Sequence, residues 1–196
     1  LEVVLAGGAR LNAEAAKKIK STLGCDYHQN LGMAEGMLFW TERDDPEDLL
    51  LNTQGAPMFE DDEIRVVDEN DQEVPYRELG ELLVRGPTTI RGYYHSPEYN
   101  KKAFTEDGFY RTGDVVRMVR GRYLAVEGRI KDTINRGGEK ISAEEVENHI
   151  LAHPKVENCA YVAMPDPVLA EKGCAFILTK GNQSLTLDEL CRFLKE

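Results

Sequence analysis

Apolar and polar residues alternate along the chain in a pattern that first predicts a β-α-β unit. The apolar run LEVVLAGG (1–8) is typical of a buried strand followed by a turn. The segment LNAEAAKKIKSTLG (11–24) has helical periodicity, with Asn12 as its N-cap and Gly24 just past its C-terminal end. A short strand pattern, CDYHQNLGM (25–33), follows. Two strands around a helix favour a parallel crossover and hence an α/β layer.

Short strand patterns joined by turn residues dominate the middle of the chain. They are EIRVVDENDQEVP (63–75), GELLVRG (80–86) and DVVRMVRGRYLAVEG (114–128), with Asp, Asn, Gly and Pro at the turns. This section is expected to form an antiparallel sheet or a distorted, barrel-like one. Before the third pattern, SPEYNKKAF (96–104) predicts a short helix with Pro97 in its first turn.

A second alternation of helices and strands occupies the C-terminal part of the chain. SAEEVENHILAHP (142–154) predicts a helix in which Ser142 is the N-cap and Glu145, three residues on, completes a capping box. Two strand patterns follow, VENCAYVAMP (156–165) and EKGCAFILTK (171–180). This part is therefore expected to be a small α/β domain of its own.

The last pattern, LTLDELCRFLKE (185–196), predicts an amphipathic helix with Leu187, Leu190 and Leu194 on one face. The whole chain thus reads as a mixed α/β protein of two domains, residues 1–130 and 131–196. Because the chain starts in a strand pattern without an initiator methionine and stops in a helix, we expect it to be an interior piece of a longer protein.

Composition narrows the class of protein. With 196 residues and 41% hydrophobic content, the chain can bury a core. A formal net charge of −11 disfavours binding to a nucleic-acid backbone, which requires a basic face. No apolar run approaches the roughly 20 residues that span a bilayer, so no membrane partner is expected. The four cysteines stand apart without a CxxC pair, which favours reduced thiols in a cytoplasmic protein.

Two glycine-containing turns follow strand patterns and are candidates for ligand contact. In LAGGAR (5–10) the glycines directly after a strand allow close approach of a ligand to backbone N–H groups, although the same glycines also suit a plain turn. In GMAEG (32–36), Glu35 lies at the end of a strand, where open α/β sheets bind ligands. The alternative for Glu35 is a solvated loop residue.

Later polar residues are candidates for nucleotide contact. In YRTGD (110–114), the carboxylate of Asp114 could accept hydrogen bonds from both hydroxyls of a ribose, or it could simply form an Asx turn that opens the next strand. Arg129 and Lys131 could neutralise phosphate, or decorate a linker between the domains.

Taken together, these stretches are more specific than any one of them. LAGGARL, NLGMAEG, YRTGDVVR, VEGRIKDTINRGGEKISAEEVENHI and VAMPDPVLAEKGCAFI, in this order, closely resemble the adenylate-forming superfamily of acyl- and aryl-acid ligases. Within it, GMAEG and KDTINRGGEKISAEEVENHILAHP are most similar to the aryl-acid activating enzymes of siderophore synthesis, the 2,3-dihydroxybenzoate-AMP ligases. The resemblance implies that 1–130 ends the large adenylating domain and that 131–196 belongs to the small mobile one.

The resemblance also implies roles for individual residues. Glu35 would help to coordinate Mg²⁺ on ATP, Arg129 would reach the ribose or phosphate, and Lys131 would be the hinge; these three are the candidate catalytic residues. The candidate ATP and AMP contacts are Gly8, Ala9, Arg10, Gly32, Met33, Ala34, Asp114, Val126 and Arg129. The candidate acid pocket is Ala6, Gly7, Asn30 and Leu38. The candidate pantetheine contacts in a second, thioester-forming pose are Gly137, Gly138 and Lys140.

The implied reaction has two half-reactions, namely formation of an acyl-adenylate from an acid and ATP, and transfer of the acyl group to a thiol. The thiol would be the phosphopantetheine of an aryl carrier protein, or coenzyme A in the general acyl-CoA ligases, which are the alternative. A non-catalytic nucleotide-binding remnant is a third possibility, since the phosphate loop and the C-terminal lysine of the family lie outside these 196 residues. The piece alone is therefore expected to be inactive.

Three positions depart from the family pattern. Leu31 replaces an aromatic residue that stacks near adenine. Asn30 is polar where a small apolar residue is expected for dihydroxybenzoate. Ala170 stands where glycine is common.

Overall fold

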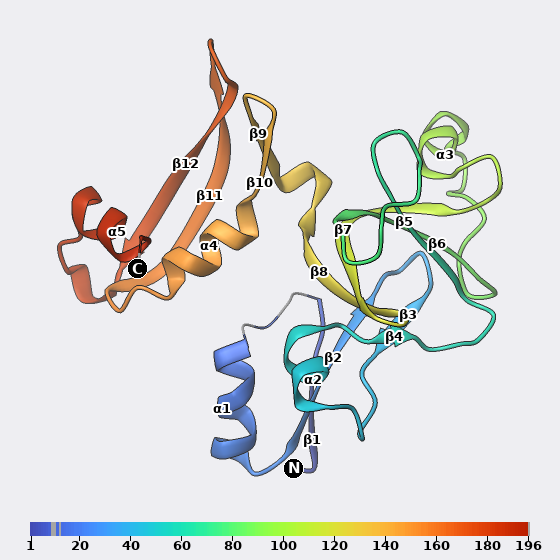
Figure 1. The fold of residues 1–196 in the computed structure, drawn as a ribbon, viewed down its shortest axis with the longest axis horizontal. Coiled ribbons are helices and arrows are strands. Elements are labelled where there is room, and N and C mark those ends of the chain that lie inside the picture. Colours follow the sequence, from blue (N-terminus) through green and yellow to red (C-terminus); the bar gives the residue numbers. More distant parts are fainter. Residues whose placement is uncertain (9–10, 12, 196) are drawn as a thin grey trace. The chain divides into compact units, whose positions relative to one another are not determined.

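The computed structural model describes residues 1–8, 11 and 13–195, and it divides the chain into unit 1, Leu1–Val126, and unit 2, Glu127–Glu196 (Figure 1). The predicted domain boundary, between residues 130 and 131, marks the expected hinge. Because a hinge is defined by motion, this boundary stays a prediction. Each unit is described by itself. Among the described residues, no helix is both long and apolar enough to cross a membrane.

The first sheet of unit 1 contains the predicted parallel crossover. Strands β1 and β2 pair in parallel from Val3 opposite Asp26 to Ala6 opposite Gln29, and helix α1 connects them. Gly24 ends α1 with φ +66°, as expected for a residue after a helix. The order of the strands is β1-β2-β3-β4. The elements are β1 Val3–Ala6, α1 Ala13–Leu23, β2 Asp26–Gly32, β3 Leu38–Trp40, α2 Glu47–Asn52 and β4 Ala56–Pro57.

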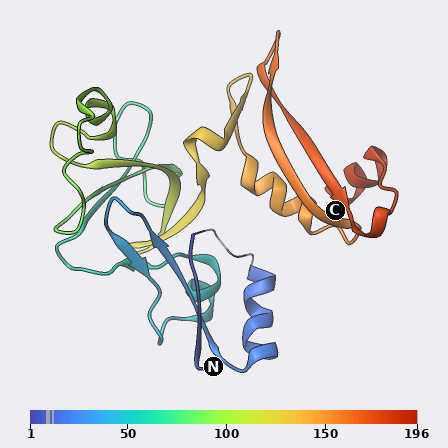
Figure 2. The same cartoon turned by 180° about the vertical axis from the view of Figure 1, so that it is seen from behind.

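The expected burial of the first strand is wrong for one of its faces. Val3 and Leu5 are 43% and 47% exposed. The strand β1 is at the edge of the sheet, and α1 covers only the face that carries Val4 and Ala6, which pack with Ala16 of the helix. Figures 1 and 2 show α1 alongside β1 and β2.

The second sheet of unit 1 is open. Its order is β5-β6-β7-β8, and β5, β6 and β7 pair antiparallel, so the predicted antiparallel sheet is confirmed whereas its barrel-like alternative is wrong. The strands remain a single layer that packs against the first sheet instead of closing on itself. The elements are β5 Glu63–Val67, β6 Gly80–Arg85, α3 Pro97–Ala103, β7 Tyr110–Arg120 and β8 Tyr123–Arg129.

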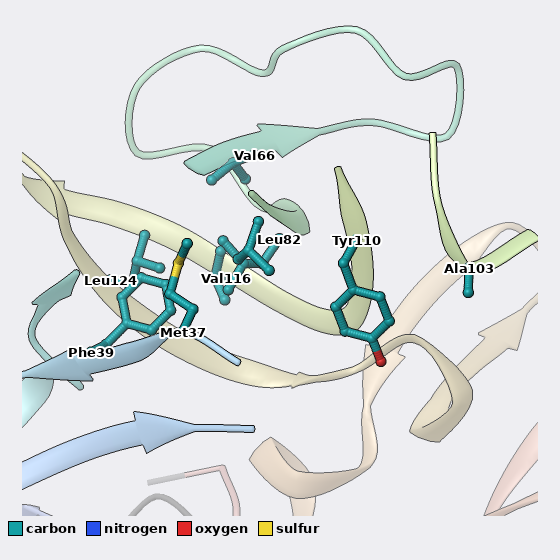
Figure 3. Packing of buried hydrophobic residues seen from close by; sticks show 9 residues of the cluster. Met37, Phe39, Val66, Leu82, Ala103, Tyr110, Val116 and Leu124 are labelled. Carbon is teal, nitrogen blue, oxygen red and sulfur yellow. The ribbon is translucent and has the colours of Figure 1, made fainter. Parts of the chain in front are cut away.

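One hydrophobic core joins the two sheets of unit 1 (Figure 3). Phe39 of β3, Leu82 of β6, Val116 of β7 and Leu124 of β8 are completely buried in it, and Met37 enters from the turn before β3. Because every strand of the second sheet contributes to this cluster, the loops at its margin rest on a rigid base.

Unit 2 is a four-stranded sheet with two helices and the order β10-β9-β12-β11. Ser142 caps α4 as predicted, because its Oγ accepts the N–H of Glu145 at 3.2 Å, and it also donates to the carbonyl of Glu127 at 2.8 Å. Figure 2 shows α4 beside the long β11–β12 hairpin. The elements are η1 Ile130–Asp132, β9 Thr133–Arg136, β10 Glu139–Ser142, α4 Ala143–Leu151, β11 Val156–Asp166, β12 Ala170–Thr179, η2 Lys180–Asn182 and α5 Leu187–Phe193.

The predicted apolar face of the last helix is only partly buried. Leu190 is 5% exposed and packs with Ile150 and Val156, whereas Leu187 and Leu194 are 75% and 42% exposed. The helix α5 has seven residues, so a single turn of it reaches the core of unit 2.

Candidate active site

The candidate acid pocket is built where β1 ends beside β2. Gly7 follows the last paired residue of β1 and lies against Asn30, so that a Cβ on Gly7 would meet Asn30 Oδ1 at 2.0 Å. Only glycine fits there without displacing the amide. Asn30 Oδ1 is buried and has no hydrogen-bond partner among the described residues. Leu38 pairs with Gly32 across β2 and β3. The structure thus brings Gly7 close to Asn30 and Gly32 to Leu38.

Glu35 lies in the turn between β2 and β3 and is held by its backbone and its side chain. Its carbonyl accepts the N–H of Ile90 at 2.7 Å, and its Oε1 accepts the hydroxyl of Tyr93 at 2.6 Å. The Tyr93 hydroxyl is also 3.0 Å from that of Tyr110 on β7. Burial, together with the bonds to Glu35 and Tyr110, raises the pKa of Tyr93 far above its usual range, so the phenol stays protonated and keeps donating to Glu35.

The turn around Glu35 leaves no room for a larger backbone substituent. Gly36 has φ +107°, and a Cβ there would lie 2.0 Å from the carbonyl oxygen of Thr88. The hydroxyl of Thr88 accepts the N–H of Met37 at 3.2 Å. The Glu35 carboxylate is therefore presented by a tightly fixed turn.

Asp114 is presented by a bulge in the middle of the second sheet. Residues 112–114 of β7 lie opposite the single residue Leu82 of β6, because Leu83 pairs with Arg111 and Glu81 with Val115. Gly113 takes φ +72° inside this bulge. The Thr112 hydroxyl donates to the carbonyl of Leu82 at 2.9 Å and accepts the N–H of Asp114 at 3.0 Å. Bulges turn side chains to new directions and occur beside active sites.

Asp114 is 4% exposed, so its carboxylate is buried and not a solvated turn residue. The alternative of an Asx turn that merely opens the next strand does not fit, because Asp114 lies inside β7, Tyr110–Arg120.

Two buried glutamines join Val126 to the first sheet. The N–H of Val126 donates to Gln54 Oε1 at 2.7 Å, and Gln54 Nε2 donates to Gln29 Oε1 at 3.0 Å. Gln29 Nε2 in turn donates to the carbonyl of Leu51 at 3.0 Å. The middle of β8 is thereby hydrogen-bonded through two side chains to β2, the strand that contains Asn30.

The candidate residues of unit 2 lie on a short stretch of backbone that begins at the last residue of β8. Arg129 ends β8 and Lys131 is the middle residue of the 3-10 turn η1, and both side chains are exposed. Gly137 and Gly138 form the two-residue turn between β9 and β10, with φ values of +61° and +98°. Lys140 lies on β10 opposite Asn135. The glycine-rich segment is therefore an ordered hairpin.

Some predicted residues lie outside the described part of the chain, namely Ala9, Arg10 and Asn12. Ala6 is on β1, and Gly8, Met33 and Ala34 lie in the turns that follow β1 and β2.

A magnesium ion bound to nucleotide phosphates requires only one or two protein carboxylates. In the described ranges no three His, Cys, Asp or Glu side chains are grouped to hold a metal by themselves. Glu35, a carboxylate fixed by its hydrogen bonds, fits a magnesium site that uses one protein carboxylate together with the nucleotide phosphates.

A surface hollow lined by Arg65, Lys101 and Arg111 in unit 1 is poorly suited to bind a phosphate. Three cations line it, but Arg65 pairs with Asp107 at 2.7 Å, Arg111 with Asp71 at 2.6 Å, and Lys101 with Glu98 at 2.8 Å. An anion would have to displace a carboxylate from each of them.

Comparison with known families identifies the family of the chain. Residues 1–94 match the model of the AMP-binding enzymes, and residues 145–196 match the model of the AMP-binding enzyme C-terminal domain. The chain belongs to the AMP-binding enzymes. The predicted membership of the adenylate-forming superfamily is thus confirmed, and the two matched regions fall in unit 1 and unit 2.

Individual relatives give the comparison more detail. The chain is 54% identical over its whole length to 2,3-dihydroxybenzoate-AMP ligase of Bacillus subtilis, and it covers 36% of that protein. It is 53% identical over 190 residues, 97% of its length, to salicylyl-CoA synthase / salicylate adenylyltransferase of a Streptomyces species, covering 34% of it. ATP-bound MatB of Rhodopseudomonas palustris superimposes with a TM-score of 0.88 at 26% identity, over 97% of this chain and 38% of MatB. The chain therefore spans about a third of the length of these relatives.

Sequence reasoning missed the side chains that hydrogen-bond to the candidate site residues Glu35 and Val126 and to one another. Tyr93 donates to Glu35, Gln54 accepts from Val126, and Gln29 accepts from Gln54, yet none of the three is among the sequence-predicted site residues. The available signal was weak: Gln29 is a polar residue inside a strand pattern, and Gln54 lies in a loop, where polar residues are ordinary.

Proposed function

We propose that the full-length protein activates an aryl acid, 2,3-dihydroxybenzoate or a related hydroxybenzoate, as its adenylate and then transfers the aryl group to a phosphopantetheine thiol of an aryl carrier protein. The observation that carries the proposal is 54% identity over the whole chain to a 2,3-dihydroxybenzoate-AMP ligase. The contact of Gly7 with Asn30, the fixed Glu35 and the bulge at Asp114 support it, because each lies at a motif of the resemblance.

In the first half-reaction, an oxygen of the acid's carboxylate attacks the α-phosphorus of ATP, and the bond from that phosphorus to the pyrophosphate oxygen breaks. Asp114 would accept hydrogen bonds from the ribose hydroxyls, and Gly8, Gly32 and Val126 would contact the nucleotide. Mg²⁺ held in part by Glu35 would neutralise phosphate charge when bound. Catalysis then consists mainly of positioning and charge neutralisation.

In the second half-reaction, a thiol sulfur attacks the acyl carbon, the thiol loses its proton, and AMP leaves with the electrons of the acyl–oxygen bond. The proposed role of Lys131 as hinge and of Gly137, Gly138 and Lys140 beside the pantetheine belongs to this step. The ordered turn between β9 and β10 supports it, since two glycines at positive φ let the hairpin tip approach a narrow substrate closely.

Asn30 favours an acid with a hydrogen-bond donor on its ring. Among the described residues its Oδ1 is a buried acceptor without a partner, and such an acceptor costs about 1–3 kcal/mol until it is paired. A phenolic hydroxyl is a donor of the kind that it lacks. Because Asn30 lies against Gly7 of the candidate acid pocket, we propose a hydroxybenzoate in preference to an unsubstituted benzoate.

An acyl-CoA ligase remains the second candidate, and the name of the salicylyl-CoA synthase relative favours it. The two functions differ in the thiol that accepts the acyl group. In either case the four cysteines, which are unpaired with each other, support a reducing compartment such as the cytoplasm.

The test is acid-dependent exchange of pyrophosphate into ATP by the full-length gene product, with benzoate, salicylate, 2,3-dihydroxybenzoate and a fatty acid. The proposal expects exchange with a hydroxybenzoate and faster transfer to a phosphopantetheinylated aryl carrier protein than to coenzyme A. Exchange with the fatty acid alone, or preference for coenzyme A, would favour the general ligases. Absence of exchange with every acid would favour a nucleotide-binding remnant.

A further inference from the structure

The tip of the β9–β10 hairpin is hydrogen-bonded to the tip of the neighbouring hairpin, β11–β12. The strands β9 and β12 pair at a single position, Arg136 opposite Ala170. On either side of this pair, the N–H of Gly137 donates to the carbonyl of Leu169 and the N–H of Asn135 donates to Glu171 Oε2, both at 2.8 Å. The side chain of Glu171 thus supplies an acceptor just beyond the only paired position. Figure 1 shows the two tips side by side.

The segment that supplies these acceptors has an unfavourable backbone conformation. The N–H of Glu171 donates to the carbonyl of Leu169 at 2.8 Å, which closes a three-residue turn with Ala170 at its centre. Ala170 has φ +63°, in the left-handed region that alanine rarely adopts. A three-residue turn with positive φ at its centre is a rare and strained form. The strained turn holds in place the two groups that bind the hairpin tip.

Asp166 braces the same turn from its other end. Its Oδ1 accepts the N–H groups of Val168 at 2.9 Å and of Leu169 at 3.0 Å, and Lys172 lies 3.4 Å from its Oδ2. The N–H of Leu169, then that of Val168, and the neighbouring Lys172 hold the pKa of Asp166 below its usual range, so that it remains an acceptor.

We infer that Glu171 is a positioning residue for the thioester-forming step: through the N–H of Asn135 it holds the Gly137–Gly138 turn in the conformation that meets the pantetheine thiol. This inference rests on the proposed function, which assigns that turn to the second half-reaction. Strained backbone is kept where the surrounding structure requires it, often at functional sites. Here the two acceptors that flank the strained Ala170, the carbonyl of Leu169 and the carboxylate of Glu171, both bind N–H groups of the β9–β10 hairpin. Glu171 itself does not touch the substrate in this scheme.

The inference predicts that the two half-reactions respond differently to Glu171→Ala in the full-length protein. Pyrophosphate exchange should be unchanged, whereas single-turnover transfer from the preformed aryl-adenylate to a phosphopantetheinylated aryl carrier protein should slow roughly ten- to hundredfold, as expected when a reacting group is misplaced by about 1 Å. Glu171→Gln should keep near-normal transfer, because an amide oxygen can also accept from Asn135. Glu157→Ala, an exposed glutamate of β11, is the matched control for loss of charge and should change neither step.

Several outcomes would overturn the inference. Normal transfer by Glu171→Ala would do so, and so would an equal loss of exchange and transfer, which would indicate general damage to unit 2. Hydrogen exchange gives a second measurement: the Asn135 amide should lose protection in Glu171→Ala and keep it in Glu171→Gln, and unchanged protection would refute the contact. If the wild-type protein exchanges pyrophosphate with none of the acids, the proposed function itself fails. If the wild type exchanges normally and Glu171→Ala transfers normally, only the positioning role of Glu171 fails.

Discussion

Gln54 and Gln29 are joined by a buried hydrogen bond of 3.0 Å between their side chains, and neither residue is more than 3% exposed. Gln54 also accepts the N–H of Val126, which lies 72 residues further along the chain, so one side chain joins β2 to β8. Buried amides of this kind stabilise a fold only while all their partners remain.

Gln54→Ala should therefore lower the free energy of unfolding of unit 1 by about 2 kcal/mol, since it leaves the Val126 N–H without its acceptor and Oε1 of the buried Gln29 without its donor. Urea denaturation of the full-length protein measures this change. The control is Gln72→Ala, at an exposed glutamine of the same unit, which should stay within about 0.5 kcal/mol of wild type. Equal effects of the two substitutions would contradict the structural role of Gln54.

Asp114→Ala tests the proposed ribose contact. Loss of a charged acceptor for two hydroxyls should raise KM for ATP roughly tenfold or more while KM for the acid changes little. Steady-state pyrophosphate exchange at varied ATP gives both constants. Asp44→Ala, an exposed aspartate of unit 1, should leave them unchanged. An unaltered ATP dependence in Asp114→Ala would refute the ribose role.

Lys131→Pro tests the hinge. Lys131 is the central residue of η1, and proline there fixes its own φ and restricts Ile130 before it. If the chain pivots at this residue between half-reactions, thioester formation should fall more than adenylate formation. Lys131→Ala, which keeps backbone freedom, separates loss of the side chain from loss of motion. Equal loss of both steps in Lys131→Pro would contradict the hinge assignment.

The protonated phenol of Tyr123 should contribute to the stability of the fold, and this contribution should disappear at high pH. Burial, and then its 2.7 Å hydrogen bond to Asp45, raise the pKa of Tyr123 to about 12. Because the folded-state pKa lies above the value of about 10 in an unfolded chain, the protonated phenol stabilises the fold fully below pH ~10, and this contribution is lost as the pH rises towards ~12. Denaturation midpoints between pH 9 and pH 12 should fall more steeply in wild type than in Tyr123→Phe. Tyr94→Phe, at a tyrosine that is 89% exposed, should follow the wild-type curve.

Ala170→Gly should stabilise unit 2. At φ +63° glycine avoids the steric cost that alanine bears, and the expected gain is about 1 kcal/mol. Ala175→Gly in the same strand, β12, is the matched control and should instead lose roughly 0.5–1 kcal/mol, because glycine has more freedom to lose in a regular strand. Thermal unfolding of both variants decides the point, and a loss of stability in Ala170→Gly would contradict the strain.

Much of the architecture followed from local patterns in the sequence. The periodicity of residues 11–24 and the glycine after it predicted α1, and the capping box at Ser142 predicted the start of α4, because helix ends are satisfied by neighbours within a few residues. The order of glycine-containing turns and motifs was enough to identify the family. These features depend on residues close together in the chain, and a sequence displays them directly.

Relations between distant segments were decided only by the tertiary structure. The sequence carries no sign that Tyr93 donates to Glu35, that Gln54 links β2 to Val126, or that Glu171 binds the turn beside Asn135, because each bond forms only after strands far apart in the chain have packed together. Burial also depends on distant segments: Val3 looks like a core residue by its type, yet within these 196 residues it is 43% exposed. Side-chain type and spacing determine which elements form, whereas long-range packing determines which of their faces are covered and which polar groups meet.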